Sequence, residues 1–294
     1  MKYQWIRQHR DAFPVAAMCR VLGVSDSGYH DWLQRPPSAR ATRTVKIRQE
    51  VREVFEQNGG IYGSRKIVEV LEKHEQLESA CRHTVAKAMQ EMRLRSCVAK
   101  TFKPTTTQAD PTKVPAANVL GQDFQADGPN QKWVTDITYL PTRTGWVYLA
   151  VVLDLFSRKI VGWSIDTSLA TDLVTEALRQ AVESRRPGPG LTHHSDRGCQ
   201  YTSDRYRSIL HGLGVTVSMS RKGCCYDNAV CERFFWSLKH EWTNHRSYAD
   251  LTDARSSVFH YIELFYNRTR LHQTLGYVSP EAFEADHAPA GNVA

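Results

Sequence analysis

A long apolar segment in the second half of the chain limits the possible folds most strongly. Residues Trp146–Leu155 contain one charged side chain, that of Asp154, and are otherwise aliphatic, aromatic or small. Apolar side chains at successive positions predict a strand that is buried on both faces, at the centre of a sheet. The segments Trp133–Leu140 and Ile160–Ile165 are rich in β-branched and aromatic residues and flank it through short turns. We therefore expect three consecutive strands in an antiparallel meander.

Helices and strands alternate after this meander. Apolar spacing and turn residues predict, in order, a helix at Ala170–Glu183, a strand at Leu191–Asp196, a helix at Ser203–Leu213, a strand at Val215–Ser220 and a last helix capped by Asp227 or Asn228. Three strands followed by this alternation is the element order of a ribonuclease-H-like fold. The predicted fold class of this half is therefore α/β, with a five-stranded mixed sheet and helices.

Three acidic residues are candidate metal ligands in this fold. Asp136 lies inside the first strand, where Asp is uncommon and where a buried carboxylate costs free energy unless it is paired or metal-bound. Asp196 follows the fourth strand, and Glu232 lies near the start of the last helix, so we expect all three to converge. Their oxygens would suit Mg²⁺ or Mn²⁺, and two such ions about 4 Å apart can activate a nucleophile and stabilise a leaving oxygen. Lys239 lies two helical turns beyond Glu232, and the alternative for this pair is a solvated salt-bridge face.

The front of the chain is basic. The first 120 residues carry 20 Lys and Arg against 12 Asp and Glu, whereas the remainder carries 18 against 19, so the net charge of +7 resides in the front part. This excess predicts a polyanionic partner, most often nucleic acid, with a charge that serves only solubility as the alternative.

The same part is predicted to be helical. Residues 15–25 resemble a helix, a glycine turn and the start of a second helix, which is the order of a helix-turn-helix. Three further helices are expected within residues 41–98, the second of them capped by Ser64. Basic side chains gather near the starts of the second and third of these, where a helix can meet phosphates or base edges: Arg65, Lys66, Arg82, His83 and Lys87. A helical bundle with a charged exterior is the alternative.

Composition shifts suggest five parts. They are an N-terminal helical segment (1–38), an all-α helix-turn-helix-like DNA-binding domain (39–98), a proline-containing linker (99–130), the catalytic core (131–244) and a C-terminal helical extension and tail (245–294). No apolar run approaches the roughly 20 residues of a membrane span, and the N-terminus lacks the apolar core of a signal peptide. A cytoplasmic protein without a membrane partner is therefore expected, with its seven scattered cysteines reduced.

Four short sequences, in order, carry a family resemblance. They are Trp133–Tyr139, His194–Tyr201, Tyr226–Ala229 followed by Glu232, and the pattern Tyr-Asn-x-x-Arg-x-His-x-x-Leu-Gly-Tyr-x-Ser-Pro from Tyr266. The two catalytic candidates Asp196 and Glu232 are separated by 35 residues. Together these features resemble the D-D-(35)-E core of transposases and retroviral integrases, and in particular the downstream-frame (OrfB) transposases of the IS-three family of insertion sequences. The resemblance extends from about residue 12 to residue 284.

This resemblance implies a DDE polynucleotidyl transferase. Asp136, Asp196 and Glu232 match the family's metal-binding acids, with two Mg²⁺ or Mn²⁺ ions per active site, and Lys239 matches a basic residue that contacts the DNA end. The implied reaction is cleavage at the insertion-sequence ends by water, followed by transfer of the 3′-hydroxyl to target DNA. The implied partners are terminal-repeat DNA and target DNA, a homo-oligomer assembled on DNA, and an upstream-frame partner or fusion. Cys199, Cys224 and Cys231 stand where the family often has small or polar residues.

Two other functions remain open at this stage. One is a DNA-binding protein with an inert core, which the complete acid triad argues against. The other is a ribonuclease-H-like nuclease or junction resolvase, which would cleave without joining.

Several neighbouring residues have structural alternatives. Arg197 and Arg233 flank the acids and are candidates for phosphate contact or charge balance. Asp154 is expected to be structural, His193 and His194 to be hydrogen-bonded strand residues rather than zinc ligands, and Trp146, Trp163 and Trp236 to lie in the core. Tyr266, Asn267, Arg270 and His272 form either a structural turn or a DNA contact.

Overall fold

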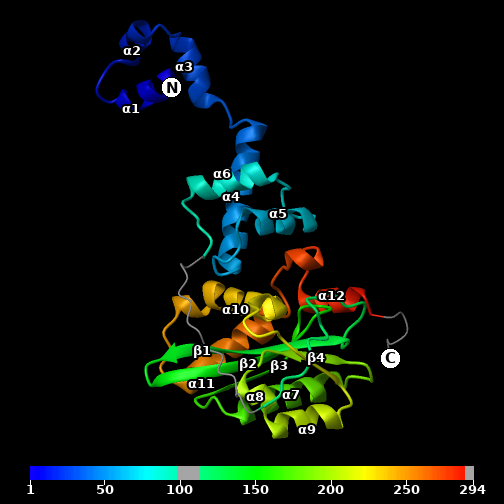
Figure 1. Ribbon diagram of the computed structural model, residues 1–294. Coiled ribbons are helices and arrows are strands. Elements are labelled where there is room, and N and C mark those ends of the chain that lie inside the picture. The colour runs from blue at the N-terminus through cyan, green and yellow to red at the C-terminus, as the bar shows by residue number, and fades with distance from the viewer. Residues whose placement is uncertain (98–112, 289–294) are drawn as a thin grey trace. The chain divides into compact units, whose positions relative to one another are not determined.

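The computed structural model describes residues 1–97 and 113–288. They belong to two compact units, Met1–Arg95 and Ser96–Ala294 (Figure 1). The first unit is helical and the second contains the sheet. The finer five-part division remains a prediction.

The second unit is built on one five-stranded mixed sheet, as predicted. Its strands are β1 (Lys132–Thr142), β2 (Gly145–Asp154), β3 (Ile160–Asp166), β4 (Thr192–Ser195) and β5 (Thr216–Met219). The order is β3-β2-β1-β4-β5, with β1 antiparallel to β2, β2 antiparallel to β3, and β4 parallel to both β1 and β5. The short β4 pairs only with the start of β1, Lys132–Val134. The rest of β1 therefore runs on without that neighbour.

Helices cover both faces of the sheet (Figure 1). The helix α7 (Thr171–Arg185), with α8 (Cys199–Thr202) and α9 (Asp204–Gly212), packs on a cluster that includes Trp133, Ala150 and Val152. The opposite cluster includes Val134 and Val151 together with side chains of α10 (Ala229–Glu241) and α11 (Leu251–Phe259). Neighbouring positions on one strand thus enter different cores, as the two-residue period of a strand requires.

Close contact between β3 and α7 depends on a glycine. A Cβ atom on Gly162 would lie 2.2 Å from the Ala177 carbonyl oxygen and 2.6 Å from the Ala181 nitrogen. Only a residue without a side chain allows the two backbones to approach in this way.

The C-terminal residues complete the core of the sheet unit. A π-helical segment, His260–Tyr266, continues α11 and places Tyr261 and Tyr266 against Phe234 of α10. The final helix is α12 (Pro280–Asp286). This segment is therefore integral to the packing of α10.

The family-like turn after this segment is structural. Asn267 pairs through its amide with both the backbone nitrogen and the carbonyl oxygen of Ile160, at 3.0 Å each. Arg270 is buried and forms a two-pronged ion pair with Glu241. His272 is also buried. Of the two alternatives from the sequence, the structure favours the structural turn.

The first unit consists of six helices among the described residues. They are α1 (Lys2–His9), α2 (Val15–Leu22), α3 (Asp26–Gln34), α4 (Ala39–Gln57), α5 (Ser64–Lys73) and α6 (Arg82–Glu91). The left-handed Gly23 ends α2, and the Ser25 hydroxyl accepts the Gly28 N–H to begin α3, which gives the predicted helix, turn and helix. The expected cap at Ser64 is wrong, because Gly63 occupies that position and Ser64 is already helical. None of the described helices has the length and apolar character needed to cross a bilayer.

Candidate active site

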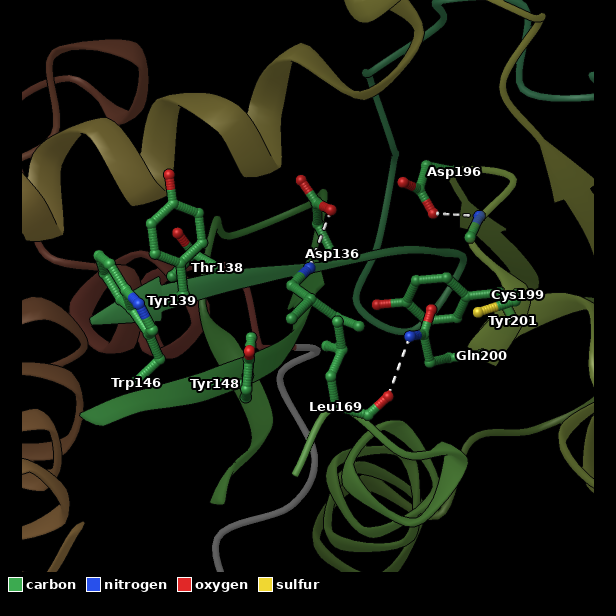
Figure 2. A pocket seen from close by; sticks show the side chains of 12 residues that line it. Asp136, Thr138, Tyr139, Trp146, Tyr148, Leu169, Asp196, Cys199, Gln200 and Tyr201 are labelled. Atoms are coloured by element: carbon green, nitrogen blue, oxygen red, sulfur yellow. Dashed lines mark hydrogen bonds between the residues drawn. The ribbon is translucent and has the colours of Figure 1, made fainter. Parts of the chain in front are cut away.

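Two of the three predicted acids line one pocket. Asp136 and Asp196 both border a cavity of about 310 Å³ (Figure 2). Asp136 lies two residues past the last β1 residue that pairs with β4, and Asp196 directly follows β4. Because β4 runs parallel to β1 and ends part-way along that strand, this topology brings residues 60 positions apart to one place.

Backbone hydrogen bonds hold both carboxylates. The Ile137 N–H donates to Asp136 Oδ1 at 2.8 Å, and the Gly198 N–H donates to Asp196 Oδ1 at 2.8 Å. The turn after Asp196 is tight, since a Cβ on Gly198 would lie 3.0 Å from that same oxygen. Arg197 points its Nε to the Ser220 carbonyl oxygen at 2.6 Å, which fixes this turn to the end of β5.

The electrostatics of the pocket disfavour an isolated anion. Burial raises the pKa of Asp136 well above its usual range, and the negative charges of Asp196 and then Glu232 raise it further, while Lys239 opposes the shift. Asp196, Glu232 and Lys239 therefore all lie within electrostatic reach of Asp136. A buried carboxylate beside two others is stabilised by a cation, so hard oxygen donors at this place fit a divalent ion.

Glu232 is placed differently from the two aspartates. It lies in the first turn of α10 and is exposed, and it does not line the pocket. Within residues 1–97 and 113–288, no group of three His, Cys, Asp or Glu side chains is close enough to enclose a metal ion. The aspartate pair is thus the assembled part of the candidate site.

The start of α10 is tied directly to the strand that carries Asp136. A 3₁₀ turn, Cys225–Asn228, precedes the helix. Asn228 stands at the N-cap of α10, but its side chain does not form the capping hydrogen bond that the sequence predicts. Instead, Asn228 Nδ2 donates to the Thr135 carbonyl oxygen at 3.1 Å. This bond links the residue before Asp136 to the loop that leads to Glu232.

A second set of bonds fixes the same loop through Asp227. The Arg221 backbone N–H and guanidinium, Asn118 Nδ2 and Gln122 Nε2 all donate to its buried carboxylate, at 2.8 to 3.1 Å. Arg221 is the main cause of a pKa for Asp227 far below the usual range of a carboxyl group. The interactions of Asp227 and Asn228 were not foreseeable, because most of their partners lie about a hundred residues away in the sequence.

Lys239 faces the pocket region from α10. Its Nζ lies 4.7 Å from the centre of the Tyr139 ring, a cation–π contact. Burial lowers the pKa of Lys239, and the negative charge of Asp136 acts in the opposite direction.

The remaining candidate DNA contacts are mostly at the surface. Arg233 is exposed, with its guanidinium 4.3 Å from the centre of the Trp236 ring. In the first unit, Lys66 lies over the Tyr62 ring at 4.8 Å. The other four are also exposed. Arg65 lies at the beginning of α5, Arg82 and His83 lie at the beginning of α6, and Lys87 lies in the middle of α6. Their contact with DNA remains a prediction.

The neighbouring histidines are structural, as predicted. His193 Nε2 pairs with the Tyr206 hydroxyl at 3.1 Å, and His194 pairs with the hydroxyls of Ser218 and Ser220 at 2.8 and 3.1 Å. Burial lowers the pKa of His193 to about 3 and that of His194 to about 4. Both rings are therefore neutral at pH 7.

Asp154 is also structural, as expected. It is fully buried and accepts the N–H groups of Asn130 and Phe156 at 2.8 and 3.0 Å. Within the described parts of the chain, Cys19, Cys81, Cys97, Cys199, Cys224 and Cys231 are not in disulfide bonds.

The prediction that Trp146 lies in the core is wrong. Its side chain is 54% exposed and lines the pocket. Trp163, by contrast, packs against the core beside α11 and donates its Nε1–H to Glu263 at 2.8 Å. Strand periodicity alone does not distinguish these cases, because Trp146 lies at the second position of β2, where the strand is still exposed.

Comparisons with known proteins match nearly the whole chain. Two models of an integrase core domain match residues 126–225 and 213–280, and a model of an HTH-like domain matches residues 43–102. The transposase InsF for insertion sequence IS3A of Escherichia coli (strain K12) is 40% identical over 288 residues, which cover 97% of this chain and 98% of the relative. A 31 kDa protein of insertion element IS600 from Shigella sonnei is 40% identical over 266 residues, covering 90% and 97%.

Solved structures with a similar fold are more distant. The HTLV-2 integrase catalytic core domain in complex with magnesium is 15% identical, with a TM-score of 0.43, covering 54% of this chain and 99% of that one. A simian T-cell lymphotropic virus intasome chain is 14% identical, with a TM-score of 0.47, covering 62% of each.

Proposed function

This chain belongs to the transposase family of IS3-type insertion sequences, and we propose that Asp136, Asp196 and Glu232 are its catalytic acids. The observation that supports this most directly is the shared pocket of Asp136 and Asp196, with Glu232 close enough to raise the pKa of Asp136. The reaction is a polynucleotidyl transfer on DNA. It proceeds in two displacements at phosphorus.

In the first displacement, a water oxygen attacks the phosphodiester at the end of the element. The bond between phosphorus and the 3′ oxygen breaks, which leaves a 3′-hydroxyl on the element and a 5′-phosphate on the flanking DNA. In the second, that 3′ oxygen attacks a target phosphodiester, loses its proton, and displaces the target's own 3′ oxygen. The number of P–O bonds is conserved in each step, so no covalent link to the protein is required.

The acids are proposed to hold two Mg²⁺ or Mn²⁺ ions. When bound, such ions activate the attacking oxygen and stabilise the leaving oxygen. The chain supplies the carboxylate oxygens, holds them by the Ile137 and Gly198 N–H groups, and fixes the Glu232 helix through Asn228. Lys239 supplies a cation beside the pocket that suits a DNA phosphate.

The first unit is proposed to bind the terminal repeats. Its HTH-like match and its exposed basic residues on α5 and α6 support this role. Assembly as a homo-oligomer on DNA and cooperation with an upstream-frame protein are also proposed. Residues 39–98 and 131–244 are the corresponding proposed DNA-binding and catalytic domains.

The decisive experiment replaces Glu232 by Gln and follows cleavage and joining of labelled element ends with Mg²⁺. We expect joining to fall by at least about 1,000-fold, because removing one charged group that acts on the transition state has effects of this order. End binding should be unchanged. The matched control is Glu183→Gln, an exposed glutamate on α7 that pairs with Arg179.

Three outcomes contradict the proposal in different ways. Joining at the normal rate by Glu232→Gln removes Glu232 from the catalytic set. Binding without cleavage by the native chain indicates an inert DNA-binding protein. Cleavage without joining indicates a nuclease.

A further inference from the structure

One wall of the carboxylate pocket is aromatic. Tyr139, Trp146 and Tyr148 line it, while Asp136 inside β1 and Asp196 directly after β4 line the same cavity (Figure 2). The rings of Tyr139 and Trp146 meet edge to face, with centroids 5.0 Å apart at 80°. This arrangement leaves Trp146 more than half exposed.

Strands of the sheet position the aromatic wall. Residues 136–139 follow the point at which β4 stops pairing with β1, so none of the five described strands pairs with this side of β1 there. Tyr139 is opposite Tyr148 in the β1–β2 pairing, and Trp146 is opposite Pro141. Rigid strands, rather than a loop, therefore position all three rings.

Polar groups at the wall indicate a polar, anionic ligand rather than a simple apolar contact. The Tyr139 hydroxyl is buried and has no hydrogen-bond partner in the described parts of the chain. The Lys239 ammonium lies over the same ring. This ammonium supplies a positive charge at the wall that suits an anionic group on a ligand.

We propose that this wall binds one unpaired DNA base beside the phosphodiester that reacts. This inference rests on the proposed function, because it takes DNA as the substrate. A cavity of about 310 Å³ has room for a nucleobase. An exposed indole offers the flat surface on which a base taken out of the duplex stacks, and Lys239 suits the adjoining phosphate.

The test measures binding affinity while a change in the protein is combined with a change in the DNA, in the manner of a double-mutant cycle. The probe is a duplex with the inverted repeat that flanks this chain's own coding sequence, made intact or with one abasic site at each of the nucleotides around the cleavage point. On intact DNA, Trp146→Ala should weaken binding by about 5- to 100-fold, the usual range for one base–aromatic stack. At one abasic position, that factor should fall below about two-fold because the stacked base is already missing. Trp146→Phe should restore most of the affinity.

The control is Phe259→Ala, a 48%-exposed aromatic residue on α11. It should bind all probes as the native chain does. A second measurement uses the native chain alone: 2-aminopurine placed at the same position should lose fluorescence on binding. The proposal is overturned if Trp146→Ala has the same effect on every probe, or if no 2-aminopurine position responds.

These readouts use binding, so they do not depend on catalysis. If the cycle shows coupling while Glu232→Gln still joins DNA, the base-binding wall stands and the catalytic assignment fails. If Glu232→Gln is inactive and no position couples to Trp146, the catalytic assignment stands and the wall is not a base site.

Discussion

Asn228 is the residue that connects the two halves of the candidate site. Its side-chain nitrogen bonds to the Thr135 carbonyl oxygen, and its side-chain oxygen is buried without a partner among the described residues. A buried acceptor without a hydrogen bond costs free energy, and a purely structural role does not account for that cost. We infer that it sets the position of Glu232 relative to Asp136.

Replacing Asn228 by Ala should therefore lower the rate of strand transfer in the bound complex. We expect a loss of roughly 10- to 100-fold, because a shift of about 1 Å in a reacting group has effects of this size. The dissociation constant for element ends should change by less than about two-fold. Single-turnover rates at saturating protein measure the first quantity, and a gel-shift titration measures the second.

The control is Asn244→Ala, an exposed asparagine in the turn after α10. A parallel loss of thermal stability and DNA affinity in Asn228→Ala, with an unchanged bound rate, would assign Asn228 to folding instead.

At the scale of elements, the loop between β5 and α10 depends on the ionised Asp227. Its pKa is lower in the folded chain than in the unfolded chain, mainly because Arg221 donates to it. The charged form therefore contributes its full stabilisation above the unfolded pKa of about 3.9, and this contribution is lost progressively as the pH falls from that value toward the lower pKa of the folded chain.

Asp227→Asn should reveal this dependence. At pH 7 we expect a loss of about 1–3 kcal/mol in the free energy of unfolding, the range for hydrogen bonds to a charged group. Near pH 3 the difference from the native chain should become smaller. Urea unfolding at both pH values measures it, with the exposed Asp172→Asn as control. An equal difference at both pH values would show that the charge of Asp227 is not involved.

The elements themselves were largely predictable, whereas several contacts between them were not. The central strand and the alternation after it follow from local apolar patterns, and Asp136 stood out because a strand rarely carries a carboxylate. The short helix α8 was missed, since its four residues lie in what reads as a turn. The bond from Asn228 to Thr135 spans 93 residues, and the 54% exposure of Trp146 depends on the packing of the whole unit, so no local pattern contains either.

At the scale of the whole molecule, the excess of basic residues and the candidate catalytic acids lie in different parts of the chain. Most of the basic excess belongs to the front of the sequence, while the acids belong to the sheet unit. Such a division predicts that DNA affinity and catalytic rate can be changed separately. Lys and Arg contacts to phosphate release counterions, so affinity that depends on them weakens as salt rises.

The triple replacement Arg65→Ala, Arg82→Ala and Lys87→Ala should test this division. All three residues are exposed on α5 and α6. If each contacts one phosphate, the slope of log affinity against log salt should fall by about 3, at roughly 0.9 per contact. The joining rate at saturating protein should remain within about two-fold of the native value.

A matched triple replacement on the same unit provides the comparison. Arg7 and Arg10 lie on or next to α1 and Arg40 lies at the start of α4, outside both the α2–α3 pair and the residues that match the HTH-like model. Their replacement by Ala removes the same charge, so a general electrostatic effect would change the salt slope equally in both variants. A larger change in the α5 and α6 variant assigns phosphate contact to those helices, and equal changes would place DNA binding elsewhere.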